Sequence, residues 1–154
     1  MNEEPSRFIN HFIKSQLNQI GIELQNKLQN RFRPNLITLL FYGSRIRGDF
    51  EPESDLDTLI VLDYLNEVEM ERNISRICGE LTRKFFIKVS PYTISKADFI
   101  FGCKNFFPFN LGVYLSYHTL IGTDFIEENH KYITEAIQSG KLQVYSRSGI
   151  FIQR

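Results

Sequence analysis

Residues 41–61 read Phe-Tyr-Gly-Ser-Arg-Ile-Arg-Gly-Asp-Phe-Glu-Pro-Glu-Ser-Asp-Leu-Asp-Thr-Leu-Ile-Val, and this stretch decides the fold. Gly43 and Ser44 follow an apolar run, and a polar loop separates them from two aspartates. These aspartates, Asp55 and Asp57, open a second apolar run. Side chains two residues apart project from the same face of a strand. The sequence therefore predicts that both carboxylates point into one cleft.

The apolar runs on either side of the polar loop predict two central strands of a sheet. The first covers residues 36–42 and is nearly unbroken, which is typical of a strand buried on both faces. The second covers residues 56–62. A third strand is expected over residues 85–95, where Pro91 favours an edge position or a bulge.

The remaining elements are predicted mainly from apolar residues that recur with the period of a helix. This periodicity predicts amphipathic helices over residues 6–29 and 66–84. Later in the chain we expect an irregular aromatic-rich stretch over 99–109, a helix over 111–120, a helix over 125–138 followed by Gly140, and a hairpin over 142–153 that turns at Ser148-Gly149.

Strands that alternate with helices predict an α/β (α+β) fold, in which helices flank a small mixed sheet. The chain has 154 residues, a length that suits one domain with a substantial core. We therefore expect a single domain over residues 1–154. Its core would cover about residues 6–95, and residues 96–154 would add a region of helices and a hairpin.

The composition excludes several classes of protein. Lysine and arginine number 18, as do aspartate and glutamate, so the net charge does not favour a nucleic-acid partner. No apolar run approaches the length of a membrane-spanning helix, and the first residues lack a signal-peptide pattern. Two cysteines, Cys78 and Cys103, are too few for a disulfide framework. A cytoplasmic protein without a membrane partner is expected.

The paired aspartates suit a site that holds a nucleoside triphosphate with magnesium. Magnesium prefers oxygen ligands and keeps several waters, so a few carboxylates and the phosphates can complete its coordination. Two carboxylates on one face of a strand supply such ligands. Metal ions bound in this way align the phosphates and stabilise the attacking and leaving oxygens of a displacement. Asp55 and Asp57 are therefore the candidate catalytic residues and metal ligands.

The residues before these aspartates suit contacts with the triphosphate. Gly43 allows a tight turn that brings the backbone close to phosphate. Ser44 offers a hydroxyl and a backbone N–H, especially where a helix begins. Arg45 and Arg47 could pair with phosphate charge in the forked geometry of arginine. Ser54 is expected to cap the turn before the aspartates or to orient the first of them.

Together these residues carry a resemblance to a known family. The segments Gly-Ser-Arg-Ile-Arg-Gly at residues 43–48 and Ser-Asp-Leu-Asp at residues 54–57 resemble the signature of the minimal nucleotidyltransferase (MNT) family. This family is a branch of the DNA polymerase beta-like nucleotidyltransferase superfamily. The order helix, strand, motif, strand, helix, strand is also similar. The resemblance covers the motif and the predicted core of the chain.

The resemblance implies a nucleotidyltransferase fold and a set of roles for the motif. Gly43 and Ser44 would contact the triphosphate, and Asp55 and Asp57 would bind magnesium, with two ions in an active enzyme. ATP or another nucleotide would be the substrate. The family also implies pairing with a helical HEPN-type toxin, which such antitoxin-like proteins neutralise by transferring AMP to it. A homo-oligomer remains open.

One position departs from the family pattern. Active members generally place a third carboxylate on the strand after the second helix, but residues 86–92 of this chain read Phe-Ile-Lys-Val-Ser-Pro-Tyr. Depending on the register, Ser90 or Lys88 takes that place. Two hypotheses therefore remain open: an enzyme that transfers AMP from ATP to a protein hydroxyl, and a nucleotide-binding or protein-binding module without transfer chemistry. Transfer to a small molecule or to RNA has less support.

Overall fold

The computed structural model describes residues 5–65, 68–146 and 149–152. In chain order its elements are α1 (Pro5–Phe32), β1 (Leu36–Tyr42), α2 (Ser44–Arg47), β2 (Leu56–Leu62), α3 (Val68–Phe85), β3 (Val89–Ser95), α4 (Lys96–Lys104), α5 (Pro108–Leu115), β4 (Tyr117–Ile121), α6 (Thr123–Gln138), β5 (Leu142–Ser146) and β6 (Gly149–Ile152).

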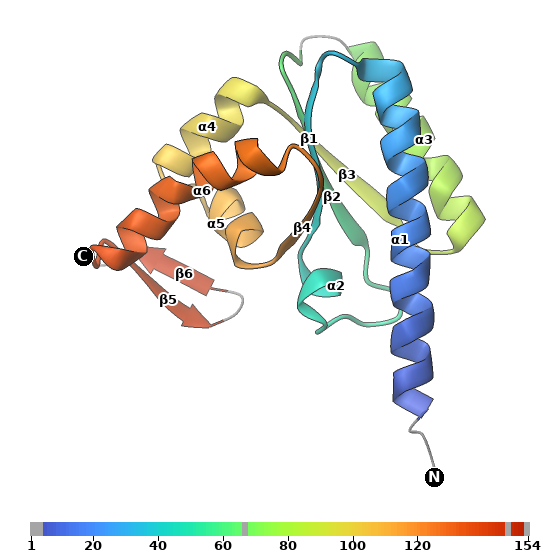
Figure 1. Ribbon diagram of the computed structural model, residues 1–154, viewed down its shortest axis with the longest axis horizontal. Coiled ribbons are helices and arrows are strands. Elements are labelled where there is room, and N and C mark those ends of the chain that lie inside the picture. Colours follow the sequence, from blue (N-terminus) through green and yellow to red (C-terminus); the bar gives the residue numbers. More distant parts are fainter. Residues whose placement is uncertain (1–4, 66–67, 147–148, 153–154) are drawn as a thin grey trace.

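The main sheet has four strands in the order β3-β2-β1-β4. β1 pairs antiparallel with β2 and with β4, whereas β2 and β3 are parallel, so the sheet is mixed. Figure 1 shows this sheet between α1 and α3 on one side and α4, α5 and α6 on the other. A second sheet consists of the hairpin β5–β6. The predicted α/β fold with a small mixed sheet flanked by helices is confirmed.

Alternating side chains of the central strands build an apolar cluster on each face of the sheet. In β1, Leu39 and Phe41 join the cluster that packs against α1 and α3. Leu40, between them, joins the cluster under α4, α5 and α6. Each side chain of this size stabilises the fold by about 1.5–3 kcal/mol when fully buried. A strand buried on both faces needs such an unbroken apolar sequence, which explains the pattern.

The sequence predicted the elements around the motif closely. β1 and β2 coincide with the predicted strands over 36–42 and 56–62. α1 and α6 extend the predicted helices by a few residues, and α3 matches the described part of the third. β5 and β6 form the predicted hairpin, although part of its turn lies outside the described residues. The single domain over residues 1–154 stays a prediction.

The predicted helix over residues 111–120 is wrong in its second half. α5 ends at Leu115, and the chain continues as β4, which pairs with the free edge of β1. β-branched and aromatic residues suit a strand, but the pairing itself depends on a partner that is distant in the sequence. Local apolar spacing could not reveal this partner, so the edge strand was missed.

Two further boundaries differ from the prediction. Residues 99–109 are not irregular: α4 covers most of them, and Ser95 caps its start by accepting a hydrogen bond from the Asp98 N–H at 3.1 Å. The strand predicted from residue 85 begins only at Val89, because α3 continues to Phe85. Phe86 then adopts a left-handed conformation with φ of 56°, which interrupts the chain before β3.

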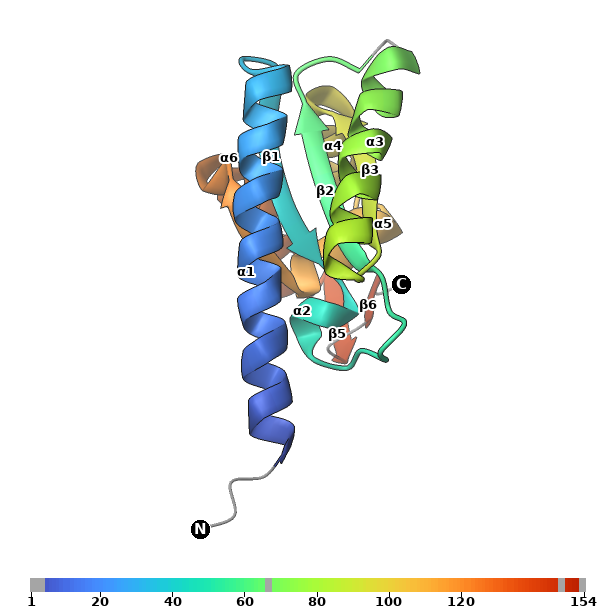
Figure 2. The same ribbon diagram turned by 90° about the vertical axis from the view of Figure 1, so that its right-hand side faces the viewer.

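The long helix α1 packs on the sheet with only part of its length. Its N-terminal turns project past α2, away from the rest of the molecule (Figure 2). Among the residues that the structure describes, none of the helices combines the length and the hydrophobicity that a bilayer crossing requires. The cytoplasmic location predicted from the sequence stays a prediction.

One histidine lies inside the apolar layer between the sheet and α6. His130 is 4% exposed, and neither ring nitrogen has a hydrogen-bond partner among the described residues. Its ring contacts those of Tyr114 and Tyr117, with centroids 5.2 Å and 4.8 Å away. Burial lowers the pKa of His130 from 6.5 to about 4, because the imidazolium would lose its hydration there. The imidazole is therefore neutral at pH 7.

This neutral histidine predicts a loss of stability in mild acid. The folded-state pKa lies below the unfolded one, so the full stability is present above pH 6.5 and falls as the pH approaches 4. We expect the free energy of unfolding of the wild type, relative to His130→Phe, to fall by up to about 3 kcal/mol over this interval. Urea unfolding at several pH values measures the difference. The control is His118→Gln, a change at an exposed histidine. In this variant the free energy of unfolding should fall with pH as it does in the wild type. A constant difference between wild type and His130→Phe would contradict a buried neutral ring.

Candidate functional site

The turn after β1 is built on a glycine that no other residue could replace without strain. Gly43 has φ of 83° and precedes α2, and its carbonyl oxygen accepts hydrogen bonds from Ile46 N–H at 3.1 Å and Arg47 N–H at 3.0 Å. Positive φ is costly for residues that carry a Cβ atom. The turn therefore presents Ser44 as the first residue of α2.

The same glycine lets the turn approach an aspartate on the neighbouring strand. A Cβ atom added at Gly43 would lie 2.5 Å from Oδ2 of Asp57, closer than real Cβ atoms approach oxygen. The register of β1 and β2 places Tyr42 opposite Asp57, which brings the carboxylate beside the turn. The glycine turn and the Asp57 carboxylate thus lie side by side in the structure.

A serine that the sequence did not single out fixes this turn from the other side. Gly43 N–H donates to the Ser116 carbonyl oxygen at 3.2 Å, and Ser116 Oγ donates to the Gly43 carbonyl oxygen at 3.2 Å. Ser116 lies between α5 and β4, so its position depends on the edge strand. Sequence reasoning missed it because a helix was expected there.

The two aspartates lie close together at the start of β2. Asp57 belongs to β2, and Asp55 precedes it. Burial raises the pKa of Asp57, and the negative charge of Asp55 raises it further, whereas the positive charge of Arg47 lowers it. The carboxylates are therefore close enough to repel each other, which is the electrostatic condition that a bound cation relieves.

Asp55 is held by two residues around the start of β3. Ser90 Oγ donates to Asp55 Oδ2 at 2.7 Å, and Lys88 Nζ lies 3.7 Å from the same oxygen. The parallel register places Ser90 directly beside Asp57. Ser90, rather than Lys88, thus occupies the strand position where the family pattern implies a third carboxylate. The Lys88 side chain is 69% exposed and reaches Asp55 from outside.

Arg45 and Ser54 shape the polar loop between the glycine turn and the aspartates. Arg45 is buried, and its Nε and Nη2 atoms donate to the carbonyl oxygens of Ser54 at 2.9 Å and Pro52 at 3.2 Å. Its guanidinium also lies 4.9 Å from the ring centroid of Phe50. Ser54 Oγ accepts a hydrogen bond from Glu51 N–H at 2.8 Å, which is the expected turn cap. Both residues therefore act on the loop, and their contacts with a nucleotide stay predictions.

Arg47 lies at the last position of α2, near the carboxylates. Its Nε atom donates to both Asp49 oxygens, at 3.1 Å and 3.2 Å, and its side chain is 21% exposed. Its charge also acts on Asp57. Arg47 is thus a cation near the paired aspartates, and its contact with phosphate stays a prediction.

Three aromatic side chains pack beside Asp57. Sequence reasoning did not assign them to the site. Tyr92 and Phe109 stack with ring centroids 4.3 Å apart, and Phe109 meets Tyr42 edge-on at 5.7 Å. Burial raises the pKa of Tyr42 to about 12, and the charge of Asp57 contributes. These aromatic rings thus limit the hydration of the Asp57 carboxylate.

The donor set fits magnesium in part. Asp55 and Asp57 offer carboxylate oxygens from one face, which is the chemistry that this ion prefers. Within the described ranges, however, no group of three or more His, Cys, Asp or Glu residues is placed to hold a metal ion. The described residues therefore fit magnesium ligands shared with a triphosphate, not a metal cage made by protein alone.

Comparison with solved structures gives several similar chains. A crystal structure of a toxin–antitoxin with AMP-PNP has a TM-score of 0.49 and 14% sequence identity, covering 77% of this chain and 90% of that one. A structure of a tri-AMPylated HEPN toxin of Shewanella oneidensis in complex with an MNT antitoxin has a TM-score of 0.46 and 12% identity, covering 79% of this chain and 90% of that one.

Sequence comparison gives similar proteins and a matching family model. Two proteins of Methanocaldococcus jannaschii, each named "Putative protein adenylyltransferase", are similar to this chain. One, MJ1305, is 26% identical over 74% of this chain and 78% of its own length. The other, MJ0604, is 31% identical over 50% of this chain and 72% of its own length. The family model described as "Nucleotidyltransferase domain" matches residues 22–111, which include the glycine turn, both aspartates and Ser90.

The desolvated carboxylate of Asp57 predicts that its removal stabilises the protein. Its folded-state pKa is raised. The stability that the protonated carboxyl contributes is therefore fully present below the unfolded-state pKa, and it is lost as the pH rises through the folded-state pKa. Without magnesium at pH 7, we expect Asp57→Asn to unfold about 2 °C above the wild type. This difference should vanish below about pH 4. Calorimetry measures it, and Asp63→Asn, at the exposed residue that follows β2, is the control. A lower melting temperature for Asp57→Asn at pH 7 would argue against the buried, repelled carboxylate.

Proposed function

This chain belongs to the nucleotidyltransferase domain family, and we propose that it transfers AMP from ATP to a hydroxyl group of a partner protein with the help of magnesium. One observation carries the proposal: the Gly43 turn lies against the Asp57 carboxylate, and the charge of Asp55 acts on the same carboxylate. This arrangement combines the hydroxyl of Ser44, at the start of α2, with carboxylates for a metal ion at one end of the two central strands.

Several residues of the chain bind different parts of ATP and its metal ion. Gly43 lets the turn lie against Asp57, and Ser44 contributes its hydroxyl at the start of α2. Asp55 and Asp57 hold magnesium, and Arg47 adds positive charge nearby. When bound, magnesium supplies charge neutralisation at the phosphates and at the leaving oxygen. Arg45 keeps the loop before the aspartates in place through its bonds to carbonyl oxygens.

The proposed reaction is a displacement at the α-phosphorus of ATP. The hydroxyl oxygen of the acceptor forms a bond to this phosphorus, and the bond to the bridging oxygen breaks. Pyrophosphate leaves with the electron pair of that bond, and the hydroxyl proton passes to solvent. AMP remains on the acceptor as a phosphodiester. The protein contributes alignment and electrostatic stabilisation, which are the main requirements of such transfers.

The proposed acceptor is a helical HEPN-type toxin, for which this protein would act as the antitoxin. The resemblance of residues 43–57 to the minimal nucleotidyltransferase signature supports this pairing. The names of the archaeal relatives support a protein as the acceptor. Whether the chain also forms a homo-oligomer stays a prediction.

Removal of both aspartates tests the site. Asp55→Asn combined with Asp57→Asn should weaken magnesium-dependent ATP binding by at least about tenfold, because the metal loses both carboxylates. Titration calorimetry with ATP, in magnesium and in EDTA, measures the affinity, and circular dichroism checks the fold. The control is Glu51→Gln combined with Glu53→Gln, which removes two charges from the neighbouring loop. An ATP affinity unchanged by the double Asp replacement would refute the site.

A second function is favoured by the residues around Asp55. Ser90 stands where a third carboxylate is implied, and Lys88 already places a positive charge 3.7 Å from Asp55 Oδ2. Both features reduce the negative charge available to a second metal ion. The alternative is therefore a module that binds a nucleotide or a protein without transferring AMP.

Restoring the third carboxylate separates the two functions. Ser90→Asp would place an acid beside Asp57, and Ser90→Asn is its neutral control of equal shape. If the wild type is a binding module, AMP transfer from labelled ATP to the protein encoded by the adjacent gene should rise at least tenfold in Ser90→Asp alone, equivalent to about 1.4 kcal/mol. If the wild type is the enzyme, it labels the partner itself, and Ser90→Asp gives no such gain. Manganese titration followed by electron paramagnetic resonance counts the bound ions in each variant.

A further inference from the structure

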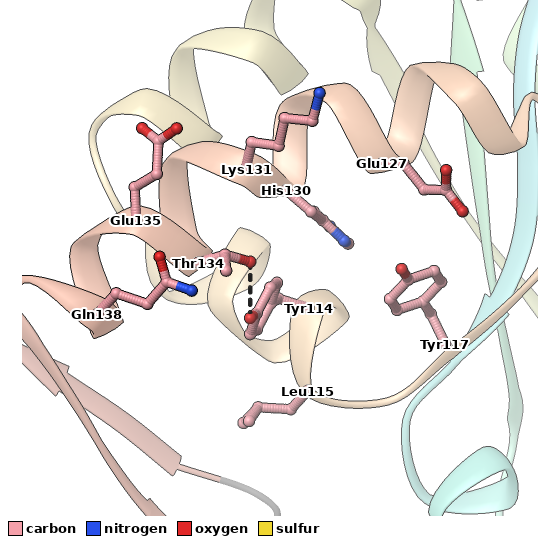
Figure 3. A pocket seen from close by; sticks show the side chains of 9 residues that line it. All are labelled: Tyr114, Leu115, Tyr117, Glu127, His130, Lys131, Thr134, Glu135 and Gln138. Carbon is pink, nitrogen blue, oxygen red and sulfur yellow. Dashed lines mark hydrogen bonds between the residues drawn. The ribbon is translucent and has the colours of Figure 1, made fainter.

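The cavity beside α6 (Figure 3) has a volume of about 620 Å³, but its lining favours no single class of ligand. Glu127, Glu135 and Lys131 bring both signs of charge to it. The hydroxyls of Tyr114 and Thr134 are 3.0 Å apart and already bond to each other. A groove along the outer edge of β3 is more selective, because its backbone, its aromatic rings and its charge all favour the same kind of molecule.

The groove along β3 has a volume of about 380 Å³ and lies beyond the aromatic rings that pack beside Asp57. β3 is the outer strand of the main sheet, and among the described strands only β2 pairs with it. α4 and the start of α5 form the other wall of the groove. The residues that matter for its chemistry are Tyr92, Thr93, Asp98, Phe101, Phe107 and Phe109.

The hydrogen-bond pattern of β3 directs one row of backbone groups away from the sheet. Leu56 N–H donates to the Lys88 carbonyl oxygen at 2.7 Å, and the parallel register pairs Leu56 with Val89. In such a pair every second residue of a strand turns its N–H and C=O toward the neighbouring strand. The even-numbered residues of β3 therefore face β2, and the odd-numbered residues, among them Thr93, direct both groups outward.

The sequence closes the first part of this outer edge and leaves the second part open. Val89 N–H donates to Thr82 Oγ1 at 3.0 Å, and Pro91 has no N–H. A proline on an edge strand is a common protection against unwanted pairing. Within the described ranges, however, the outward N–H and C=O of Thr93 have no hydrogen-bond partner. Thr93 lines the groove, so it offers one donor and one acceptor to another extended backbone.

Exposed aromatic rings lie in the groove beside this open backbone. Phe101 is 57% exposed and Phe107 is 46% exposed, and their rings meet edge-on with centroids 5.5 Å apart. Tyr92 is also 46% exposed and stacks on Phe109. Side chains of an added strand would alternate between its two faces, so every second one would lie on these rings. Exposed apolar groups gathered in this way mark an interaction site.

The charge of the groove favours a peptide over a nucleotide or a nucleic acid. Asp98 is the one charged side chain among the described residues that line it, and no described cation forms an ion pair with it. A phosphate would meet this carboxylate without a compensating cation, whereas a lysine or arginine would be attracted to it. The outward donor and acceptor of Thr93 likewise match a polypeptide backbone.

We propose that β3 binds an extended segment of a partner protein as an additional strand of the sheet. Apolar side chains at every second position of the segment occupy the groove, and a basic side chain lies near Asp98. Thr93 exchanges two backbone hydrogen bonds with the segment. Main-chain bonds of this kind supply affinity, and the side-chain contacts in the groove supply specificity.

The strand leads from the groove to the proposed transfer site. Ser90, near the start of β3, donates a hydrogen bond to Asp55, and Thr93 lies three residues farther along. An extended chain rises about 3.3 Å per residue, so a hydroxyl side chain about three residues from the one beside Thr93 reaches the level of Ser90. That this segment carries the AMP acceptor rests on the proposed function, but its binding to β3 does not.

The test uses the complete chain without ATP or magnesium, so a failure of AMP transfer does not affect it. The probe is acetyl-Lys-Phe-Thr-Phe-Thr-amide, which combines a cation with alternating aromatic and β-branched residues. Nuclear magnetic resonance of the backbone amides follows the titration. We expect a Kd of about 1 mM or lower, a downfield shift of the Thr93 amide proton and slower exchange of this proton with solvent.

Two N-methylated forms of the probe distinguish backbone pairing from simple apolar contact. One form carries methyl groups on the amide nitrogens of both phenylalanines, and the other on those of both threonines, so each form blocks one edge of the same extended peptide. Pairing with Thr93 predicts that one form loses at least about fivefold in affinity while the other keeps its affinity. Equal affinities of the two methylated forms would overturn the proposal.

Two exposed phenylalanines give a matched pair of protein variants. Phe107→Ser should weaken binding of the probe at least about fivefold, because the groove loses a ring. Phe86→Ser is the control: this residue is 92% exposed and lies outside the groove lining, so its change should leave the affinity as it is. Asp98→Asn should weaken binding about twofold, as expected for an exposed ion pair.

Three results would contradict the strand-binding groove. The first is the absence of any shift of the Thr93 amide with the probe up to about 10 mM. The second is an equal or larger shift of this amide with AMP at that concentration, which would assign the groove to a nucleotide. The third is a dimer of the free protein that Phe107→Ser dissociates in sedimentation experiments, which would assign the groove to a second copy of the chain.

Discussion

The close approach of the Gly43 backbone to the Asp57 carboxylate is the constraint on which the site depends. A Cβ atom at residue 43 would meet Asp57 Oδ2 at 2.5 Å, and φ of 83° is itself unfavourable for other residues. The antiparallel register of β1 and β2 creates this contact by placing Tyr42 opposite Asp57. The central strand pair thus sets both the core of the fold and the place of the glycine turn beside the carboxylate.

The electrostatics of this contact explain why the site favours cations and why its carboxylates destabilise the fold when no cation is near. Asp57 is partly desolvated and repelled by Asp55, and both effects raise its pKa. Arg47 acts on Asp57, and Lys88 pairs with Asp55, so the chain already supplies two positive charges. Sites of function often keep such unfavourable groups, which are compensated by stability elsewhere in the fold. Here the apolar clusters on both faces of the sheet provide that stability.

The sequence predicted those features that depend on neighbouring residues. The strands over 36–42 and 56–62 followed from apolar runs. The electrostatic proximity of Asp55 and Asp57 followed from their spacing. It could not predict what depends on distant pairing. β4 joins the sheet only because the edge of β1 is free, and Ser116 reaches Gly43 only through β4. Arg45 illustrates the same limit: its charge suggested phosphate, but its burial among loop carbonyl oxygens became visible only in three dimensions.

The edge strand also explains why two separate parts of the molecule share one constraint. Ser116 bonds to the turn at Gly43, and the next residue, Tyr117, contacts the buried His130 ring of α6. A single peptide bond separates the two contacts, so a shift of this strand would displace the turn and the packing of α6 together. The burial of His130 and the place of the glycine turn beside Asp57 therefore depend on the same two residues of the chain.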